Sequence, residues 1–301
     1  MQKIMILGGN GFLGQNLGQY ALSQNDEVYS FDRRLPEKKN DGINYIEGDF
    51  FNDDTLFSTL EQMDVIYDAI CTINPGNSEE LYKKAYEEEF PQHIKLISWI
   101  SEHNKKLVFL SSGGTVYGVQ EKQPIGEDCP TKPINHYGSL KLCIENVIKT
   151  FNVNSDNKMR IARISNPYGC GQDFRGGVGF IDATLKSAIS GKELVVYGDG
   201  SIVRDYIYID DVARLLYSLS LYDGCEEVFN ISTGVGTAQN EVIDIVKHIY
   251  PDLKIKYIEP RKVDLQKVIL DNSKITNEFP GDLVKLEDGI GRYSSFLKSM
   301  K

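Results

Sequence analysis

Three glycines spaced three residues apart constrain the fold of this chain more than any other feature of the sequence. Gly8, Gly11 and Gly14 directly follow the apolar segment KIMIL at residues 3–7 and lead into a helical pattern. Glycines at these places permit a tight turn and a close approach of the backbone to a pyrophosphate. The free N–H groups at the helix start then face the phosphate charge. The pattern predicts a strand, a dinucleotide-binding loop and a helix, with Phe12 and Leu13 also beside the cofactor.

Short apolar strands alternate with helical segments through the first half of the chain. The predicted strands cover residues 3–7, 27–32, 43–49, 63–70, 106–112 and 159–165. Such alternation predicts an α/β fold with a Rossmann-like, doubly wound parallel sheet. One long helical stretch runs from about residue 78 to residue 103, and Pro91 within it indicates that a helix begins there or is kinked.

The rhythm of strands and helices changes after about residue 166. Glycines and prolines become frequent in NPYGCGQDFRGGVG, and the strands shorten. We therefore predict an NAD-binding Rossmann domain over residues 1–165 and a smaller substrate-binding domain over residues 166–301. A segment of about 203–233 is expected to rejoin the first domain.

Charge and cysteine usage exclude several classes of function. The 301 residues carry a net charge of −10, whereas nucleic acids and anionic membranes need a positive field. The five cysteines are scattered and lack metal-type spacing, so we predict no metal site and reduced thiols in a cytoplasmic protein. No apolar run approaches the ~20 residues of a membrane helix.

Asp32 ends the second predicted strand, where a carboxylate can accept hydrogen bonds from the adenosine ribose hydroxyls. It would repel a 2′-phosphate and so favours NAD over NADP. Arg33 and Arg34 follow immediately and weaken that preference. The alternative is a solvated turn aspartate. NAD is the predicted cofactor, with Arg33 included in its site.

Tyr137 and Lys141 are four residues apart at the start of a predicted helix, so they share one face. To act as a base near neutral pH, a phenol needs its pKa lowered by ~3 units, about 4 kcal/mol. A cation ~5 Å away at an effective dielectric of ~20 supplies roughly 3 kcal/mol, and a positively charged nicotinamide can supply the rest. Tyr–x–x–x–Lys also occurs often by chance. Placed after the glycine motif, the pair predicts a proton-transferring tyrosine.

Six segments in a fixed order carry a family resemblance. They are GGNGFLG, GDF at 48–50, SSGGTVYG, Tyr137–x–x–x–Lys141, ISNPYG and VRDYIYIDD. Together they resemble the extended short-chain dehydrogenase/reductase family, in its nucleotide-sugar epimerase/dehydratase branch, and most of all the UDP-glucose 4-epimerases. The resemblance covers nearly the whole chain.

The resemblance implies roles for further residues. On the cofactor side they are Asp49 and Phe50 at the adenine, Ala69, Ile70 and Cys71 beneath the cofactor, and Ser111. On the nucleotide-sugar side they are Asn166 and Arg204 at the diphosphate, Tyr197 near the nucleobase, and Arg261 and Asp264 at phosphate and ribose. A dianionic diphosphate needs a few focused cations inside an acidic protein. Alternatively, Arg204 forms a structural salt bridge with Asp205 or Asp210, and Arg261 lies in an exposed loop.

Two positions depart from the family pattern. Related proteins usually carry a serine or threonine four residues before the tyrosine of VYG, whereas this chain has Gly113. Ser112 or Thr115 must then supply the hydroxyl that assists Tyr137, and Thr115 is preferred if the segment is extended. The second departure is Glu89, where related proteins commonly carry asparagine.

The resemblance ranks the possible reactions. A 4,6-dehydratase would carry an Asp-Glu pair where this chain has Gly114 and Thr115. Epimerisation at C4 of a UDP-hexose or other nucleotide-diphosphate sugar is therefore the expected activity, through a 4-keto intermediate with Tyr137 as acid/base. The alternatives are an NAD(P)H-dependent 4-ketosugar reductase and a non-catalytic dinucleotide-binding protein. Related enzymes also imply a homodimer.

Overall fold

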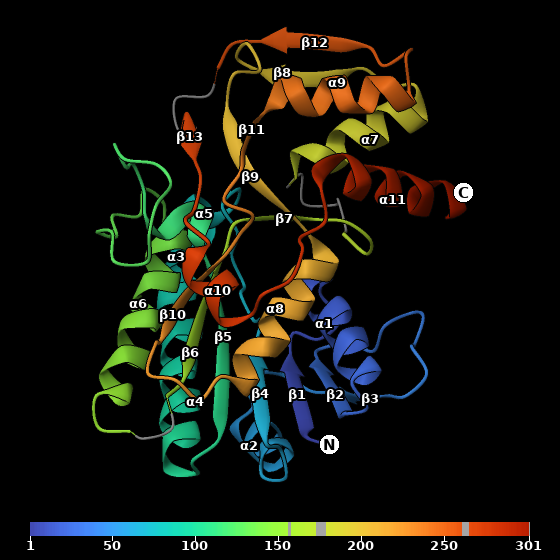
Figure 1. The fold of residues 1–301 in the computed structure, drawn as a ribbon. Helices are drawn as coiled ribbons and strands as arrows, with labels where there is room; N and C mark the ends of the chain where they lie inside the picture. Colours follow the sequence, from blue (N-terminus) through green and yellow to red (C-terminus); the bar gives the residue numbers. More distant parts are fainter. Residues whose placement is uncertain (156–157, 173–178, 261–264, 301) are drawn as a thin grey trace.

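Seven parallel strands form the central sheet, in the order β10-β6-β5-β4-β1-β2-β3 (Figure 1). The computed structural model describes residues 1–155, 158–172, 179–260 and 265–300. The sheet strands are β1 (Lys3–Leu7), β2 (Glu27–Asp32), β3 (Ile43–Glu47), β4 (Val65–Asp68), β5 (Lys106–Ser112), β6 (Arg160–Ile164) and β10 (Val228–Ile231). The predicted Rossmann-like sheet is confirmed.

Helices cover both faces of this sheet. One face packs against α1 (Phe12–Ser23) and α8 (Ile209–Leu221), and the other against α2 (Asp53–Leu60), α4 (Phe90–Glu102) and α6 (His136–Asn152). Successive strand residues point to opposite faces, so Ile4 and Ile6 join one apolar core whereas Met5 and Leu7 join the other. Burial on both faces explains why these strands are continuous apolar runs.

The long helical stretch before β5 is not a single α-helix. It consists of α3 (Ser78–Lys84), a π-helical turn η1 (Ala85–Glu89) and α4. The N–H of Phe90 donates to the carbonyl of Ala85, five residues back. Pro91 is the second residue of α4, directly after this turn, and it has no N–H to donate to the preceding turn of the helix. The interruption expected at Pro91 is thus a π turn just before the proline.

A smaller layer lies above the carboxyl ends of the central strands (Figure 1). Its sheet contains β7 (Asn166–Tyr168), β9 (Val203–Tyr208), β11 (Gly236–Ala238) and β13 (Lys267–Val268), and β8 (Leu194–Tyr197) pairs with β12 (Ile255–Ile258). Its helices are α7 (Phe180–Ser190), α9 (Gln239–Ile249) and α11 (Leu286–Ser299). Two short helices complete the chain, α5 (Gly113–Val116) after β5 and α10 (Ser273–Glu278) against β10.

The chain passes between the two layers more than once. After β7, α7, β8 and β9 have formed part of the smaller layer, α8 and β10 return to the central sheet. Within the segment 203–233, β9 therefore belongs to the smaller layer and α8 with β10 to the larger one. The two layers are interleaved along the sequence.

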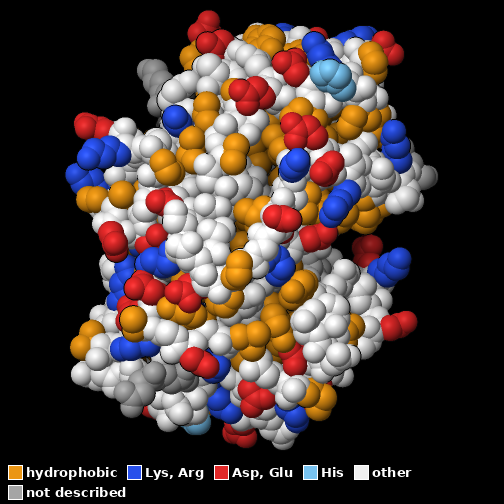
Figure 2. Space-filling model, viewed as in Figure 1, with side chains coloured by type: hydrophobic (Ala, Val, Ile, Leu, Met, Phe, Trp, Pro, Cys, Tyr) orange, Lys and Arg blue, Asp and Glu red, His pale blue; other side chains and the backbone are white. Residues whose placement is uncertain are grey.

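The surface carries both signs of charge. On the face shown in Figure 2, acidic and basic side chains are interspersed over both layers. Within the described ranges, no helix combines the length and the apolar character needed to cross a bilayer.

A buried ion pair anchors α6 to the central sheet. The Glu145 carboxylate accepts hydrogen bonds from Arg163 Nη2 of β6 at 2.7 Å and from Ser111 Oγ of β5 at 2.6 Å. Glu145 and Arg163 are 0% and 1% exposed. The Arg163 guanidinium also lies over the Tyr117 ring, 4.7 Å from its centroid. A charge this deeply buried depends on its partner, because water cannot replace it.

We expect Glu145→Ala to lower the free energy of unfolding by about 3–5 kcal/mol, because it leaves the Arg163 guanidinium buried without its carboxylate. Urea denaturation followed by circular dichroism measures the change. Glu88→Ala is the matched control, since Glu88 is exposed and pairs only at 3.6 Å with Lys84 on the helix surface. That substitution should cost at most about 0.5 kcal/mol. Equal losses in the two variants would contradict the anchoring role.

Candidate active site

The glycine loop brings β1, α1 and the end of β4 closer together than side chains would allow. Gly8 has φ +75°, and a Cβ there would lie 3.2 Å from the Ala69 carbonyl carbon and oxygen. A Cβ at Gly14 would lie 2.7 Å from the Gly8 carbonyl oxygen and from Gly9 Cα. These contacts involve backbone atoms that cannot turn away. The loop is therefore built for a backbone that passes close to a ligand.

One cavity of about 200 Å³ lies beside this loop, at the ends of β2 and β4. Asp32, Arg33, Phe50 and Ile70 are among the residues that line it. The Asp32 carboxylate accepts hydrogen bonds from the N–H groups of Arg33 at 2.7 Å and of Asn10 at 3.3 Å. Each carboxylate oxygen has a second lone pair, so ribose hydroxyls can still bind there.

Asp49 differs from its neighbours in GDF. Its side chain is exposed and accepts a hydrogen bond from the Phe51 N–H at 3.0 Å, and it does not line the cavity. Phe50 lines the cavity with its backbone neighbours Gly48 and Phe51, and its ring packs 5.0 Å from that of His93. The adenine contact assigned to Asp49 thus has no support in the lining of this cavity.

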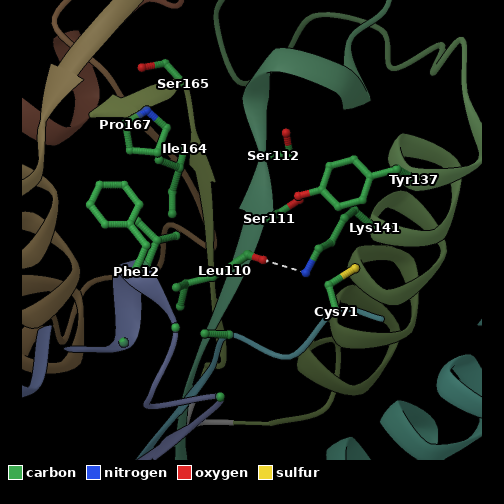
Figure 3. Close-up of a pocket in the computed structure, with 15 residues that line it drawn as sticks. Phe12, Cys71, Leu110, Ser111, Ser112, Tyr137, Lys141, Ile164, Ser165 and Pro167 are labelled. Carbon is green, nitrogen blue, oxygen red and sulfur yellow. Dashed lines mark hydrogen bonds between the residues drawn. The ribbon is translucent and has the colours of Figure 1, made fainter. Parts of the chain in front are cut away.

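A second cavity of about 230 Å³ continues toward α6. Figure 3 shows Tyr137, Lys141 and Cys71 on one side of it and Phe12, Ile164 and Pro167 on the other. The two cavities share Gly8, Gly11, Ala69 and Cys71, so they form one elongated site across the ends of the central strands. The Ser165 hydroxyl lines this site and is buried without a hydrogen-bond partner among the described residues. The shape and the open polar atom fit a dinucleotide.

Tyr137 is placed by the first turn of α6. The Asn135 side chain caps the helix by accepting a hydrogen bond from the Gly138 N–H at 2.8 Å. A Cβ at Gly138 would lie 2.8 Å from the Thr115 carbonyl oxygen, so glycine lets α6 approach α5 closely. The half-buried Tyr137 ring then reaches into the cavity beside Ser112 (Figure 3).

Burial raises the pKa of Tyr137, whereas the charge of Lys141 and a hydrogen bond with Ser112 lower it. The net direction is upward. Lys141 lowers the pKa of Tyr137 as expected, but desolvation of the phenolate opposes the cation in the protein without its cofactor. The predicted lowering applies to the complex with NAD⁺, whose positive ring adds to the effect of Lys141.

Lys141 is 2% exposed and remains an ammonium group. Its Nζ donates to the carbonyls of Leu110 at 2.9 Å and of Ile70 at 3.3 Å, and lies 4.6 Å from the centroid of the Phe109 ring. Burial lowers the pKa of Lys141, but Cys71, Tyr137, Asp68 and Glu89 together raise it further, so the net shift is upward. Its charge is thus fixed beside Tyr137.

The hydroxyl missing at Gly113 has a steric explanation. A Cβ at Gly113 would collide with Leu270 Cδ1 and lie 3.1 Å from the Arg163 carbonyl oxygen. Residues Gly113–Val116 form the helical turn α5, so the extended segment that favoured Thr115 does not exist. Thr115 Oγ1 lies 3.4 Å from the Ser112 carbonyl and does not line the cavity, whereas Ser112 does. The geometry favours Ser112 over Thr115 as the partner of Tyr137.

Of the residues assigned to the nucleotide sugar, Asn166 and Arg204 lie on neighbouring strands, whereas Tyr197 lies elsewhere. Asn166 on β7 donates from Nδ2 to the Asp205 carbonyl at 3.0 Å, and Arg204 on β9 donates to the Leu265 carbonyl at 2.7 Å. Tyr197 ends β8 and lies outside both cavities. Arg261 and Asp264 lie outside the described residues.

The two carboxylates considered as salt-bridge partners of Arg204 have other roles. Asp205 accepts hydrogen bonds from Thr233 and from the Gly234 N–H at 3.0 Å. Asp210 lies 3.8 Å from Arg292. Thr233, Gly234 and Arg292, which contact these two carboxylates, are not among the residues assigned to the nucleotide sugar.

Several lining residues went unnoticed in the sequence. Leu110, Ile164, Ser165 and Pro167 line the second cavity. Ligands of open α/β sheets bind at the carboxyl ends of the strands, so the last residues of β5 and those just after β6 could have been included on that ground.

Known proteins are similar to this chain along most of its length. The sequence model of the NAD dependent epimerase/dehydratase family matches residues 4–232. A Methanocaldococcus jannaschii protein described as a candidate UDP-glucose 4-epimerase is 30% identical over 306 aligned residues, covering 98% of both chains. The dTDP-4-dehydro-6-deoxyglucose reductase of Escherichia coli is 26% identical, covering 96% of this chain and 95% of the reductase.

A solved structure is similar over almost the whole length. The UDP-glucose 4-epimerase of Thermotoga maritima, crystallised with UDP-glucose, superposes with a TM-score of 0.91 at 27% identity and covers 99% of both chains. The same fold therefore carries the same order of elements in both proteins.

We expect Gly14→Ala to weaken NAD binding by about tenfold or more and to lower the melting temperature, because the new methyl group meets backbone atoms of the loop. Gly291→Ala on α11 is the control, since a Cβ there meets no atom within 4 Å. Calorimetric titration with NAD and thermal unfolding measure both. Unchanged NAD affinity in Gly14→Ala would show that the loop does not hold the cofactor.

Proposed function

The chain belongs to the NAD dependent epimerase/dehydratase family, and on this premise we propose that it epimerises C4 of a nucleotide-diphosphate sugar, most simply a UDP-hexose. One observation carries the proposal: Tyr137, Ser112 and the fixed cation of Lys141 converge on the cavity that the glycine loop lines. The UDP-glucose 4-epimerases among the similar proteins support the choice of sugar nucleotide.

In the proposed reaction Tyr137, as the tyrosinate, accepts the proton of the sugar 4-hydroxyl and later returns it. When held by the glycine loop and Asp32, NAD would supply reversible hydride transfer at C4, through a 4-keto sugar. Ser112 donates a hydrogen bond to the same sugar oxygen and so orients it. Lys141 keeps its proton throughout, held by the carbonyls of Leu110 and Ile70, and stabilises the tyrosinate that acts as the base.

For the nucleotide-sugar side we propose Asn166 and Arg204 at the diphosphate, Tyr197 at the nucleobase, and Arg261 and Asp264 at phosphate and ribose. Asn166 and Arg204 lie on the paired strands β7 and β9, and Pro167, next to Asn166, lines the cavity. The Arg204 guanidinium donates to the carbonyls of Val203 and Leu265, and its charge and planar donor geometry suit a phosphate. Asp32 supports NAD over NADP.

Elimination is disfavoured by α5. Its four residues, Gly113–Val116, carry no carboxylate that could serve as the acid/base pair of a 4,6-dehydratase. A 4-ketosugar reductase uses the same tyrosine and lysine, and the Escherichia coli reductase among the relatives keeps that alternative open. The two reactions differ in whether the nicotinamide cofactor is consumed. A non-catalytic protein would bind NAD without turnover.

We also propose a homodimer. The helices α4 and α6 pack side by side on one face of the sheet. The resemblance to the nucleotide-sugar epimerases implies that two subunits pair through these helices, so their outer surface is the expected interface.

We expect the purified protein to interconvert UDP-glucose and UDP-galactose, or another C4 pair from a panel of UDP-hexoses, with no net change in NADH absorbance. Tyr137→Phe should lower kcat by about 10²- to 10⁴-fold, because it removes the proton acceptor but keeps the ring. Chromatographic separation of the products measures both. Net oxidation of NADH with a 4-keto sugar would favour the reductase, and full activity of Tyr137→Phe would exclude the mechanism.

Ser112→Ala and Thr115→Ala should differ. Losing the Ser112 hydroxyl removes a hydrogen bond to Tyr137 and to the substrate, so kcat should fall by about 10- to 100-fold. Thr115→Ala should stay within about threefold of wild type, because its hydroxyl points back to the Ser112 carbonyl. Initial rates at saturating substrate make the comparison, and a larger loss in Thr115→Ala would reverse the assignment.

A further inference from the structure

A buried carboxylate lies behind the candidate active site and has no part in the reaction described above. Glu89 is 0% exposed, and its Oε2 accepts hydrogen bonds from the N–H of Thr72, at 2.8 Å, and from the Thr72 hydroxyl. Its Oε1 is buried without a hydrogen-bond partner among the described residues. Burying a carboxylate is costly, so its retention needs an explanation.

The π turn explains why Glu89 points inward. Residues Ala85–Glu89 form η1, and of its acidic residues Glu87 and Glu88 are exposed whereas Glu89 is buried. A π turn adds a residue to one helical turn and so changes which side chain faces the sheet. Here it brings a carboxylate to the turn after β4, at residue 72.

Side chains from three elements, β4, α6 and η1, hold the turn Ala69–Thr72. All four residues line the elongated cavity. The Ile70 N–H donates to Asp68 Oδ1 at 3.1 Å, the Ile70 carbonyl accepts from Lys141 Nζ at 3.3 Å, and Thr72 is held by Glu89. Glu89 holds the last residue of the turn, Thr72.

Glu89 also belongs to a group of charges around Tyr137 and Lys141. Cys71 of the turn lines the same cavity as Tyr137 and Lys141, and the next residue, Thr72, binds Glu89 of η1. Besides burial, Lys141 lowers the pKa of Tyr137 whereas Cys71 and Glu89 raise it, and Asp68 of β4 raises the pKa of Lys141. On α4, His93 Nε2 lies 3.1 Å from Asp68 Oδ2, and its Nδ1 lies 2.9 Å from the Glu89 carbonyl. Burial is the main cause that raises the pKa of the Cys71 thiol to about 12, and the charge of Glu89 adds to it.

We propose that Glu89 is a positioning residue. Its carboxylate holds the turn Ala69–Thr72 in place under the cofactor and places a negative charge behind that turn, which lines the cavity together with Tyr137 and Lys141. The positioning of the turn under the cofactor rests on the family membership. The effect of the Glu89 charge on Tyr137 rests on the proposed role of Tyr137. The asparagine common in related proteins has no charge, so the second effect distinguishes this chain from them.

Two variants of Glu89 separate the two effects. Glu89→Gln keeps the acceptor oxygen and the length but removes the charge. Tyr137 should then lose its proton at a pH lower by about one unit, whereas NAD affinity changes little. Glu89→Asp keeps the charge but is one methylene too short to reach Thr72. NAD should then bind about tenfold more weakly, with the tyrosine titration near that of wild type.

The measurements need no sugar. NMR of protein labelled with ¹³C at tyrosine Cζ follows the titration, and the Tyr137→Phe spectrum identifies the Tyr137 signal. Calorimetry gives the NAD affinity. For an active enzyme, the acid limb of kcat against pH should move to lower pH in Glu89→Gln by the same amount. Failure to epimerise any UDP-hexose would count against the proposed function and leave both measurements valid.

Controls keep the test falsifiable. Glu88→Gln removes the same charge from the exposed side of the helix and should change neither quantity. Thr72→Val removes one hydrogen bond to Glu89 without touching its charge, so it should weaken NAD binding severalfold with an unchanged titration. It also replaces the Glu89 variants if they do not fold. An unchanged titration in Glu89→Gln, or unchanged NAD affinity in both Glu89→Asp and Thr72→Val, overturns the proposal.

Discussion

The docking of α6 onto the end of β5 is the contact on which the rest of the site depends. Tyr137, Lys141 and Glu145 follow one another at intervals of four, so they form a single row along the helix. Each contacts the last residues of β5: Tyr137 at Ser112, Lys141 at the Leu110 carbonyl and Glu145 at Ser111. Arg163 of the neighbouring strand β6 also binds the Glu145 carboxylate. The reactive end of the row is therefore placed by a buried ion pair two helical turns away.

The features that were predictable from the sequence are those that short stretches determine. Three features belong to this group: the glycine loop, the six strands of the first half and the Tyr137–Lys141 pair. Each is determined by residues within about fifteen positions of one another, which is the range over which periodicity and motifs can be recognised. Pro91 correctly indicated where the long helix is interrupted. It could not show that the interruption is a π turn, because that depends on which side chain the sheet accepts.

The remaining features depend on contacts between distant segments. Gly113 excludes a side chain because Leu270 and the Arg163 carbonyl occupy its space, and no spacing near residue 113 reveals this. The same holds for Glu89, whose partner Thr72 follows another strand. Tyr137 illustrates a third limit. The charge four residues away was visible in the sequence and lowers the pKa of Tyr137 as expected, but the burial that opposes it was not visible.

The interleaved path of the chain has a consequence for biosynthesis. β6 ends at Ile164, but its outer neighbour β10 begins only at Val228. At ribosomal rates of about 5–20 residues per second, the edge of β6 waits roughly 3 to 13 seconds for its partner. An open apolar strand edge invites pairing with other chains during that interval. The nascent protein is thus most exposed to aggregation while the smaller layer is being synthesised, and a chaperone that covers this edge would act at that stage.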